Sequence, residues 1–197
     1  MYKRQELVLG PVESTVQTEI AAQRKIDMDA VLVAMDSERY RKLITEIHSW
    51  RLDPPFTEAA AAPAEEVRGY VKRAEKKVTK RLGGAVVARQ AAASGEAAED
   101  ADELFHRARK AAKRHRYAVE ATVPLWGSKA EKVVAARKDL QDVLGHHQDR
   151  IVQSAFLREL GARLGVRSGQ NGFTYGVLYS AVMAEGKTLV GDLKPYL

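Results

Sequence analysis

The residues best suited to binding chemistry form a cation-rich run between positions 104 and 120. Projected on a helix at about 100° per residue, this run separates into a charged face and an apolar face. The charged face carries His106, Arg109, Lys110, Lys113, Arg116 and Tyr117. No acid is expected on this face, and neighbouring cations on a helix repel each other by roughly a few tenths of a kcal/mol. A bound polyanion would relieve that repulsion, because phosphate oxygens accept hydrogen bonds from such side chains.

A second cationic strip is predicted earlier in the chain, on a helix over residues 67–82. Its members lie within about 60° of one another on the same projection, and they are Arg73, Lys76, Lys77 and Lys80. An apolar stripe occupies another side of that helix. If the two helices pack with their apolar sides inward, the two strips can border one basic groove. The alternative is a pair of solvated faces whose ion-pair partners lie on other helices.

The charge of the chain is concentrated in these two segments. Residues 67–82 carry seven basic side chains and one acid, and residues 104–119 carry six and none, whereas the whole chain has a formal charge of +6. The remainder is therefore net acidic. This distribution favours a focused anion site over diffuse attraction to a membrane surface.

Composition indicates one all-α domain in a reducing compartment. The chain has 197 residues, 45% of them hydrophobic, and no cysteine, which excludes disulfides and thiolate metal sites. Alanine is frequent, aromatics make up 7%, and no segment shows sustained polar/apolar alternation. No apolar stretch is long enough to span a membrane, and the N-terminal residues do not resemble a signal peptide. We therefore expect a cytoplasmic protein.

Hydrophobic periodicity, prolines and glycines predict an antiparallel bundle of about seven helices within a single domain over 1–197. The helix boundaries are set mainly by Gly10-Pro11, Asp53-Pro54-Pro55, Pro63, Ser94-Gly95 and Pro124. Residues 53–63 read as an internal linker. Breaks are expected at Gly83-Gly84 and at Gly145. The expected helices cover about 12–35, 37–53, 63–82 with a continuation over 85–93, 99–124, 128–145, 148–164 and 173–185.

Catalytic and metal-binding patterns are weak in this sequence. His146-His147-x-Asp149 and Asp102-x-x-x-His106 offer too few converging ligands for a metal, and the histidine pair reads as polar surface. There is no phosphate-binding G-x-x-x-x-G-K-[ST] loop and no nucleophile elbow around a serine. We expect no enzyme activity, no cofactor and no metal.

The segment H-x-x-R-K-x-x-K-R-x-R-Y, His106 to Tyr117, resembles the signature of the CHAD domain, the conserved-histidine α-helical domain. The later stretch RKDLQDVLGHHQD is similar to a second segment of that family, and NGFTYG at 171–176 to its C-terminal turn. The resemblance covers roughly residues 100–180, with weaker similarity through the earlier helices. It implies non-catalytic binding of inorganic polyphosphate in a basic cavity, with Lys138 and Gln141 as neighbours of the signature helix. Association with CYTH-type triphosphate-processing domains and with polyphosphate granules is implied as well.

Two departures from the family pattern matter. A usually aliphatic position is His115 here, which we interpret as a buried, hydrogen-bonded imidazole. A complete CHAD domain resembles two halves with one signature helix each, and only the second signature is found. The chain is then expected either to be the C-terminal part of a larger domain or to complete its cavity as a homodimer.

Two alternative functions remain open: a nucleic-acid-binding helical protein and a regulatory partner of a CYTH-type enzyme. The basic faces lack the interleaved aromatic residues that stack on bases, which disfavours the nucleic-acid binder.

Overall fold

The computed structural model describes residues 9–96, 100–166, 172–185 and 188–197. Every regular element in these ranges is helical, so the predicted all-α class is confirmed. The long helices are α1 (Val12–Asp36), α2 (Glu38–Trp50), α3 (Val67–Ala93), α4 (Ala101–Glu120), α6 (Ser128–Leu164) and α7 (Phe173–Glu185). The short elements are η2 (Glu58–Ala61), η3 (Ala64–Glu66), α5 (Val123–Trp126), α8 (Leu189–Leu193) and η5 (Lys194–Tyr196).

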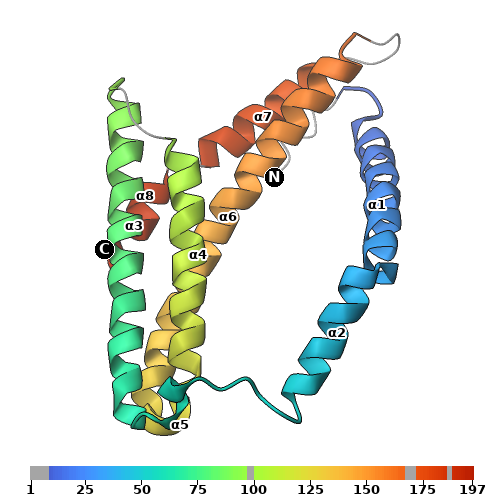
Figure 1. The fold of residues 1–197 in the computed structure, drawn as a ribbon. Helices are drawn as coiled ribbons and strands as arrows, with labels where there is room; N and C mark the ends of the chain where they lie inside the picture. Colours follow the sequence, from blue (N-terminus) through green and yellow to red (C-terminus); the bar gives the residue numbers. More distant parts are fainter. Residues whose placement is uncertain (1–8, 97–99, 167–171, 186–187) are drawn as a thin grey trace.

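The centre of the fold is an antiparallel arrangement of α3, α4 and α6, which lie side by side (Figure 1). Helix α4 turns small residues inward, among them Ala108, Ala111 and Ala112, and these permit close approach of its neighbours. Phe105 and Leu140 fill the space between the helices and are almost completely buried. Burial of each large apolar side chain of this kind contributes about 1.5–3 kcal/mol to stability. The core therefore fixes which face of α4 points outward.

Helices α1 and α2 stand apart from this bundle (Figure 1). Val12 packs with Leu160, Leu164 and Tyr175 where α1 meets α6 and α7. Arg163 donates both terminal nitrogens to the carboxylate of Glu19, at 3.2 and 2.7 Å. Beyond this anchor the apolar residues of both helices are exposed: Ile20, Ile26, Val31, Leu32, Val33, Leu43, Ile44, Ile47 and Trp50. Leu43, Ile44, Ile47 and Trp50 recur at helical spacing along α2, but no residue of α2 is buried.

Two of the predicted helix breaks are wrong. Helix α3 continues through Gly83 and Gly84, because Leu82, Ala85 and Val86 on either side are buried in the core. Helix α6 is 37 residues long and continues through Gly145. The two helices expected over 128–145 and 148–164 are therefore one. Burial of the flanking side chains outweighs the roughly 1 kcal/mol that a glycine costs in a helix interior.

The chain between α4 and α6 also differs from the prediction. Helix α4 ends at Glu120 instead of running to Pro124, which lies in the first turn of the separate helix α5. The predicted helix over 37–53 is confirmed, with the Ser37 hydroxyl accepting a hydrogen bond from the Tyr40 amide at 3.2 Å. The predicted helix over 173–185 is confirmed as α7. The glycine-rich turn before it falls largely outside the described residues, and the expected linker over 53–63 contains η2.

None of the helices in the described ranges is long and apolar enough to cross a membrane.

Candidate functional site

Helix α4 begins at a well-defined cap. The side chain of Asp100 accepts hydrogen bonds from the amides of Asp102 at 2.9 Å and Glu103 at 3.5 Å. The helix then buries one face against α3 and α6. This orientation leaves the predicted binding residues on the other face, which we call the signature face: His106, Arg109, Lys110, Lys113, Arg116 and Tyr117. The amphipathic projection of this helix is confirmed.

The residues of the signature face differ in their exposure to solvent. Lys110, Lys113 and Tyr117 are exposed, whereas His106, Arg109 and Arg116 are half-buried. The Tyr117 ring lies beside two cations, with the Arg116 guanidinium 4.9 Å and the Lys113 ammonium 5.9 Å from the ring centroid. These cation–π contacts hold the cations close together without neutralising them.

One acid does reach the signature face, contrary to expectation. Glu120 lies one turn beyond Arg116, and its Oε1 is 3.5 Å from Arg116 Nε. The other three cations of this face form no ion pair with any residue in the described ranges. Their charge is therefore available to an anionic ligand.

Three polar side-chain atoms of the signature face are buried and have no hydrogen-bond partner among the described residues. They are His106 Nδ1, Arg109 Nε and Arg116 Nε, the last of which faces Glu120 in the ion pair described above. A buried polar group left in this state costs about 1–3 kcal/mol. All three atoms belong to side chains that the sequence pattern assigned to ligand binding, and their burial shows that the inner parts of these side chains are packed against the bundle.

Helix α6 supplies the neighbouring surface. The Arg109 guanidinium lies against Gly145, where an added Cβ would come within 3.9 Å of Arg109 Nε. Lys138 and Gln141 share the Gly145 face of α6, since they precede it by seven and four positions. The antiparallel register that pairs Arg109 with Gly145 sets Gln141 level with Lys113. That Lys138 and Gln141 act as neighbours of the signature face in binding stays a prediction; Gln141 is half-buried and donates Nε2 to the Arg137 carbonyl at 3.0 Å.

The α3 strip, consisting of Arg73, Lys76, Lys77 and Lys80, is exposed along its whole length. The Arg73 guanidinium lies over the Tyr70 ring at 4.4 Å. Arg81, next to the strip, donates to the Arg107 carbonyl of α4 at 3.2 Å. No ion pair or hydrogen bond in the described part of the chain joins this strip to the signature face. Both strips lie opposite the apolar sides of their helices, and a groove shared by them stays a prediction.

His115 is buried and hydrogen-bonded, as interpreted from the sequence. Its ring is 1% exposed, and its Nδ1 accepts a hydrogen bond from Arg137 Nε at 2.9 Å. Arg137 NH2 also lies 3.7 Å from Glu75 Oε1, so the three residues link α4, α6 and α3. Burial and the adjacent Arg137 charge lower the pKa of His115. The imidazole is therefore neutral at physiological pH.

Only one histidine of the pair after Gly145 lies on the surface, so the expectation that both are polar surface residues is wrong for the other. His146 is exposed, but His147 is buried with its Nε2 3.0 Å from Asp102 Oδ1. Arg89 contacts the same carboxylate oxygen. The hydrogen bond from His147 and the charge of Arg89 lower the pKa of Asp102, although burial acts in the opposite direction. Asp102 thus joins α4 to α3 and α6. Within the described ranges, no group of three or more potential metal ligands occurs.

The signature face lies within the part of the chain that matches a known family. The sequence model of the CHAD domain matches residues 2–158, which include α1 to α5 and most of α6. This chain belongs to the CHAD domain family. The CHAD match includes the earlier helices, for which the sequence showed only weaker similarity, and it ends before NGFTYG at 171–176, so that stretch lies outside the matched part.

Two curated relatives of this CHAD domain come from Mycobacterium tuberculosis. They are the uncharacterized proteins MT2285 of strain CDC 1551 and Rv2226 of strain H37Rv, each 32% identical over 178 residues. The alignments cover 88% of this chain but 31% of each relative, so the chain spans about a third of their length. No solved structure matches the chain.

Proposed function

We propose that this CHAD domain binds inorganic polyphosphate through the signature face of α4 and does not cleave it. CHAD is a family associated with polyphosphate binding, which supports the choice of ligand. The observation that carries the proposal is that three cations on one helix face, Arg109, Lys110 and Lys113, form no ion pair with any described residue. Phosphate oxygens would accept hydrogen bonds from their ammonium and guanidinium groups and balance the charge.

A linear polyphosphate suits this face better than a single phosphate ion. The cations of the signature face follow the helix axis at successive turns, about 5.4 Å apart. A chain of phosphates can contact several turns at once, with Arg116, Lys138 and Gln141 at one end of the path. Binding of this kind releases counterions, so its affinity falls as salt concentration rises.

The α3 strip is proposed as a second contact for long chains. Arg73, Lys76, Lys77 and Lys80 are exposed, and with Arg73 packed on Tyr70 they form a continuous cationic surface. Lys76→Ala with Lys80→Ala should weaken binding of long polyphosphate and leave tripolyphosphate unaffected. Equal weakening of both ligands, or of neither, would contradict this extended contact.

Calorimetric titration in one buffer tests the proposal. Long-chain polyphosphate, tripolyphosphate and single-stranded DNA are titrated at the same salt concentration. We expect long-chain polyphosphate to bind most tightly. DNA binding as tight as that of polyphosphate at equal phosphate concentration would contradict the proposal and support a nucleic-acid binder. Release of phosphate from polyphosphate by the highly purified protein with Mg²⁺ would contradict the non-catalytic part.

The wider role that we propose is that of a scaffold or targeting module. The chain spans about a third of its curated relatives, so a full-length protein of that size has room for a further domain. A CYTH-type triphosphate-processing domain is the partner we propose. Size-exclusion chromatography of the two proteins with and without polyphosphate tests this, and independent elution under both conditions would contradict it.

A further inference from the structure

A cavity lies on the opposite side of α4 from the signature face, where the ends of α3, α4 and α6 meet. Its volume is about 870 Å³, within the range of about 300–1,000 Å³ typical of small-molecule sites. His115 and Val119 line it from α4, and no residue of the signature face or of the α3 strip does so. This cavity is therefore separate from the surface proposed for polyphosphate.

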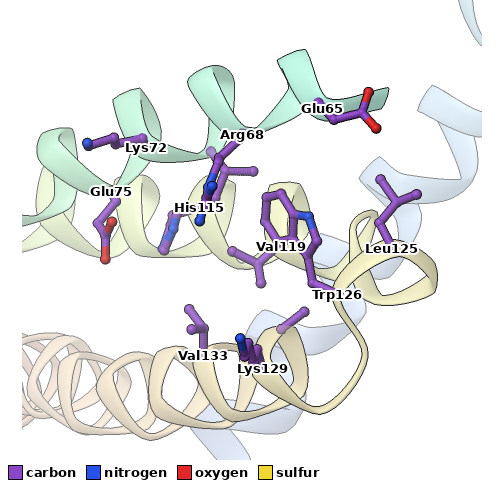
Figure 2. A pocket seen from close by; sticks show the side chains of 12 residues that line it. Glu65, Arg68, Lys72, Glu75, His115, Val119, Leu125, Trp126, Lys129 and Val133 are labelled. Carbon is purple, nitrogen blue, oxygen red and sulfur yellow. The ribbon is translucent and has the colours of Figure 1, made fainter. Parts of the chain in front are cut away.

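One wall of the cavity is apolar and contains an aromatic ring. Val71, Val119 and Val133 contribute aliphatic surface from three helices, and Trp126 adds its indole. Figure 2 shows the Trp126 ring standing beside Val119, between the start of α3 and the start of α6. Such a surface accepts a planar aromatic group by stacking, which is worth about 1–3 kcal/mol per ring.

The position of Trp126 depends on the turn that follows it. Gly127 has a φ of +51°, a left-handed conformation that other residues adopt at a cost. The turn ends α5 at Trp126 and starts α6 at Ser128. This reversal brings the indole back over the apolar wall instead of leaving it in solvent.

Cations surround the apolar wall. Arg68 and Lys72 lie one turn apart on α3 and Lys129 lies on α6, and none of the three forms an ion pair with a residue in the described part of the chain. Glu65 and Glu75 also line the cavity, but the Glu75 carboxylate already faces Arg137. Figure 2 shows Arg68 extending from α3 toward the space beside His115. The cationic surplus favours an anionic group on the ligand.

His115 offers a directional hydrogen bond to the same space. Its Nδ1 accepts from Arg137, which can only donate, so the neutral ring carries its proton on Nε2. That N–H has no hydrogen-bond partner among the described residues. A side chain that is 1% exposed and yet lines the cavity therefore presents an unused donor to it.

We propose that this cavity binds a small organic anion with a planar aromatic ring and one phosphate, of the mononucleotide type. The ring stacks on Trp126, and a ring nitrogen or carbonyl accepts the His115 Nε2–H hydrogen bond. The phosphate lies among Arg68, Lys72 and Lys129. Polyphosphate has no ring and would leave the apolar wall uncovered, so the two ligands are expected at different sites.

The fluorescence of Trp126 gives a direct test. The chain has two tryptophans, and Trp50 on α2 is exposed, so Trp50→Phe leaves Trp126 as the sole reporter. This variant is titrated with AMP, with adenosine and with ribose 5-phosphate in the same salt. We expect saturable quenching by AMP and at least tenfold weaker binding of the two fragments. No saturable quenching by millimolar AMP would overturn the proposal, as would ribose 5-phosphate binding as tightly as AMP.

Matched variants locate the phosphate. Arg68→Gln with Lys129→Gln should weaken AMP binding at least tenfold and leave adenosine binding unchanged. Lys76→Gln with Lys80→Gln removes the same charge from the outer face of α3 and should leave AMP binding unchanged. Equal loss in both double variants would reveal nonspecific charge attraction and overturn the site.

Two further readouts separate this proposal from the polyphosphate proposal. The ¹H and ¹⁵N resonances of His115 Nε2 should shift on addition of AMP, a change that requires no substitution near the core. Arg109→Ala with Lys113→Ala should not change AMP affinity, whatever it does to polyphosphate. Displacement of AMP by equimolar tripolyphosphate would overturn the requirement for a ring, and unchanged His115 resonances at saturating AMP would remove this residue from the site.

Discussion

The guanidinium of Arg109 on α4 lies directly against Gly145 on α6, with Nε and NH2 both 3.9 Å from the position of an added Cβ. A glycine at this point of a 37-residue helix has no left-handed backbone to explain it. An added Cβ would meet Arg109 at ordinary contact distance, so alanine fits at position 145. We expect a longer side chain at this position to displace the central cation of the signature face.

The size of the side chain at position 145 should control polyphosphate binding. Gly145→Leu is expected to push the Arg109 guanidinium aside and weaken binding about tenfold. Gly145→Ala meets Arg109 at ordinary contact distance, so it should preserve binding and raise stability by up to about 1 kcal/mol through helix propensity. Calorimetric titration and thermal unfolding of both variants check this. Unaltered affinity in a folded Gly145→Leu protein would contradict the role of the contact.

His115 should make the protein less stable as pH falls below neutrality. Its pKa in the folded state lies below the unfolded value of 6.5, so the unfolded state binds the proton first and gains stability as pH drops. Breaking the Arg137 contact with His115→Gln should cost about 1–3 kcal/mol at pH 7.5. Urea unfolding should show this difference shrinking between pH 7.5 and 5. A difference that grows in this interval would contradict the neutral, buried imidazole.

Asp102 should stabilise the fold at neutral pH and lose this effect in acid. Its pKa in the folded state is lower than 3.8, so its contribution is complete above about pH 4 and disappears as pH falls through the folded value. Asp102→Asn should cost about 1–2 kcal/mol at pH 7, a modest value because the carboxylate is half-exposed. Asp36→Asn, which removes the partner of an exposed Arg41 ion pair, is the matched control and should change stability by less than about 0.5 kcal/mol. Equal effects of the two variants would show that Asp102 does not join α4 to its neighbours.

The helical periodicity of α4 was enough to predict its outward face, because its buried residues recur at helical spacing from Ala101 to Val119. The same method failed at Gly83, Gly84 and Gly145. Local propensity favours a break at each of them, but packing of Leu82, Ala85 and Leu144 against neighbouring helices keeps the helix intact. Burial against neighbouring helices is not visible in a local sequence pattern, so helix propensity alone predicts a break at each of these glycines.

The cavity beside Trp126 could not be found from the sequence. Its cations come from α3 and α6, its donor from α4 and its aromatic ring from α5, and no local spacing links them. Lys72 is not a member of the α3 strip, and it lines the cavity instead. The one local signal is Trp126 followed by Gly127, and its meaning depends on a turn geometry that only the structure provides.

Helices α1 and α2 should mediate self-association. Val33 is 75% exposed and Ile26 is 62% exposed, and the apolar stripe continues along α2. Exposed apolar surface of this extent usually acquires a partner, and a two-fold dimer is the commonest arrangement. Polyphosphate should strengthen the dimer by offsetting repulsion between two signature faces.

Light scattering at micromolar concentration, with and without polyphosphate, tests this self-association. Ile26→Glu with Val33→Glu should give a monomer that keeps its helicity, and Arg24→Glu with Lys25→Glu, on the same helix but cationic, is the control. A wild-type monomer under both conditions would contradict self-association and leave α1 and α2 to another partner.

The salt dependence of polyphosphate affinity tests the central claim most directly. Each phosphate neutralised by a cation releases counterions, so log affinity should fall linearly with log salt concentration. Arg109→Ala with Lys113→Ala should lower the affinity at least tenfold and reduce the slope by about two, one for each lost contact. Arg24→Ala with Lys25→Ala removes equal charge from α1 and should leave the slope unchanged. A double signature-face variant with the slope and affinity of the wild type would contradict binding at this face.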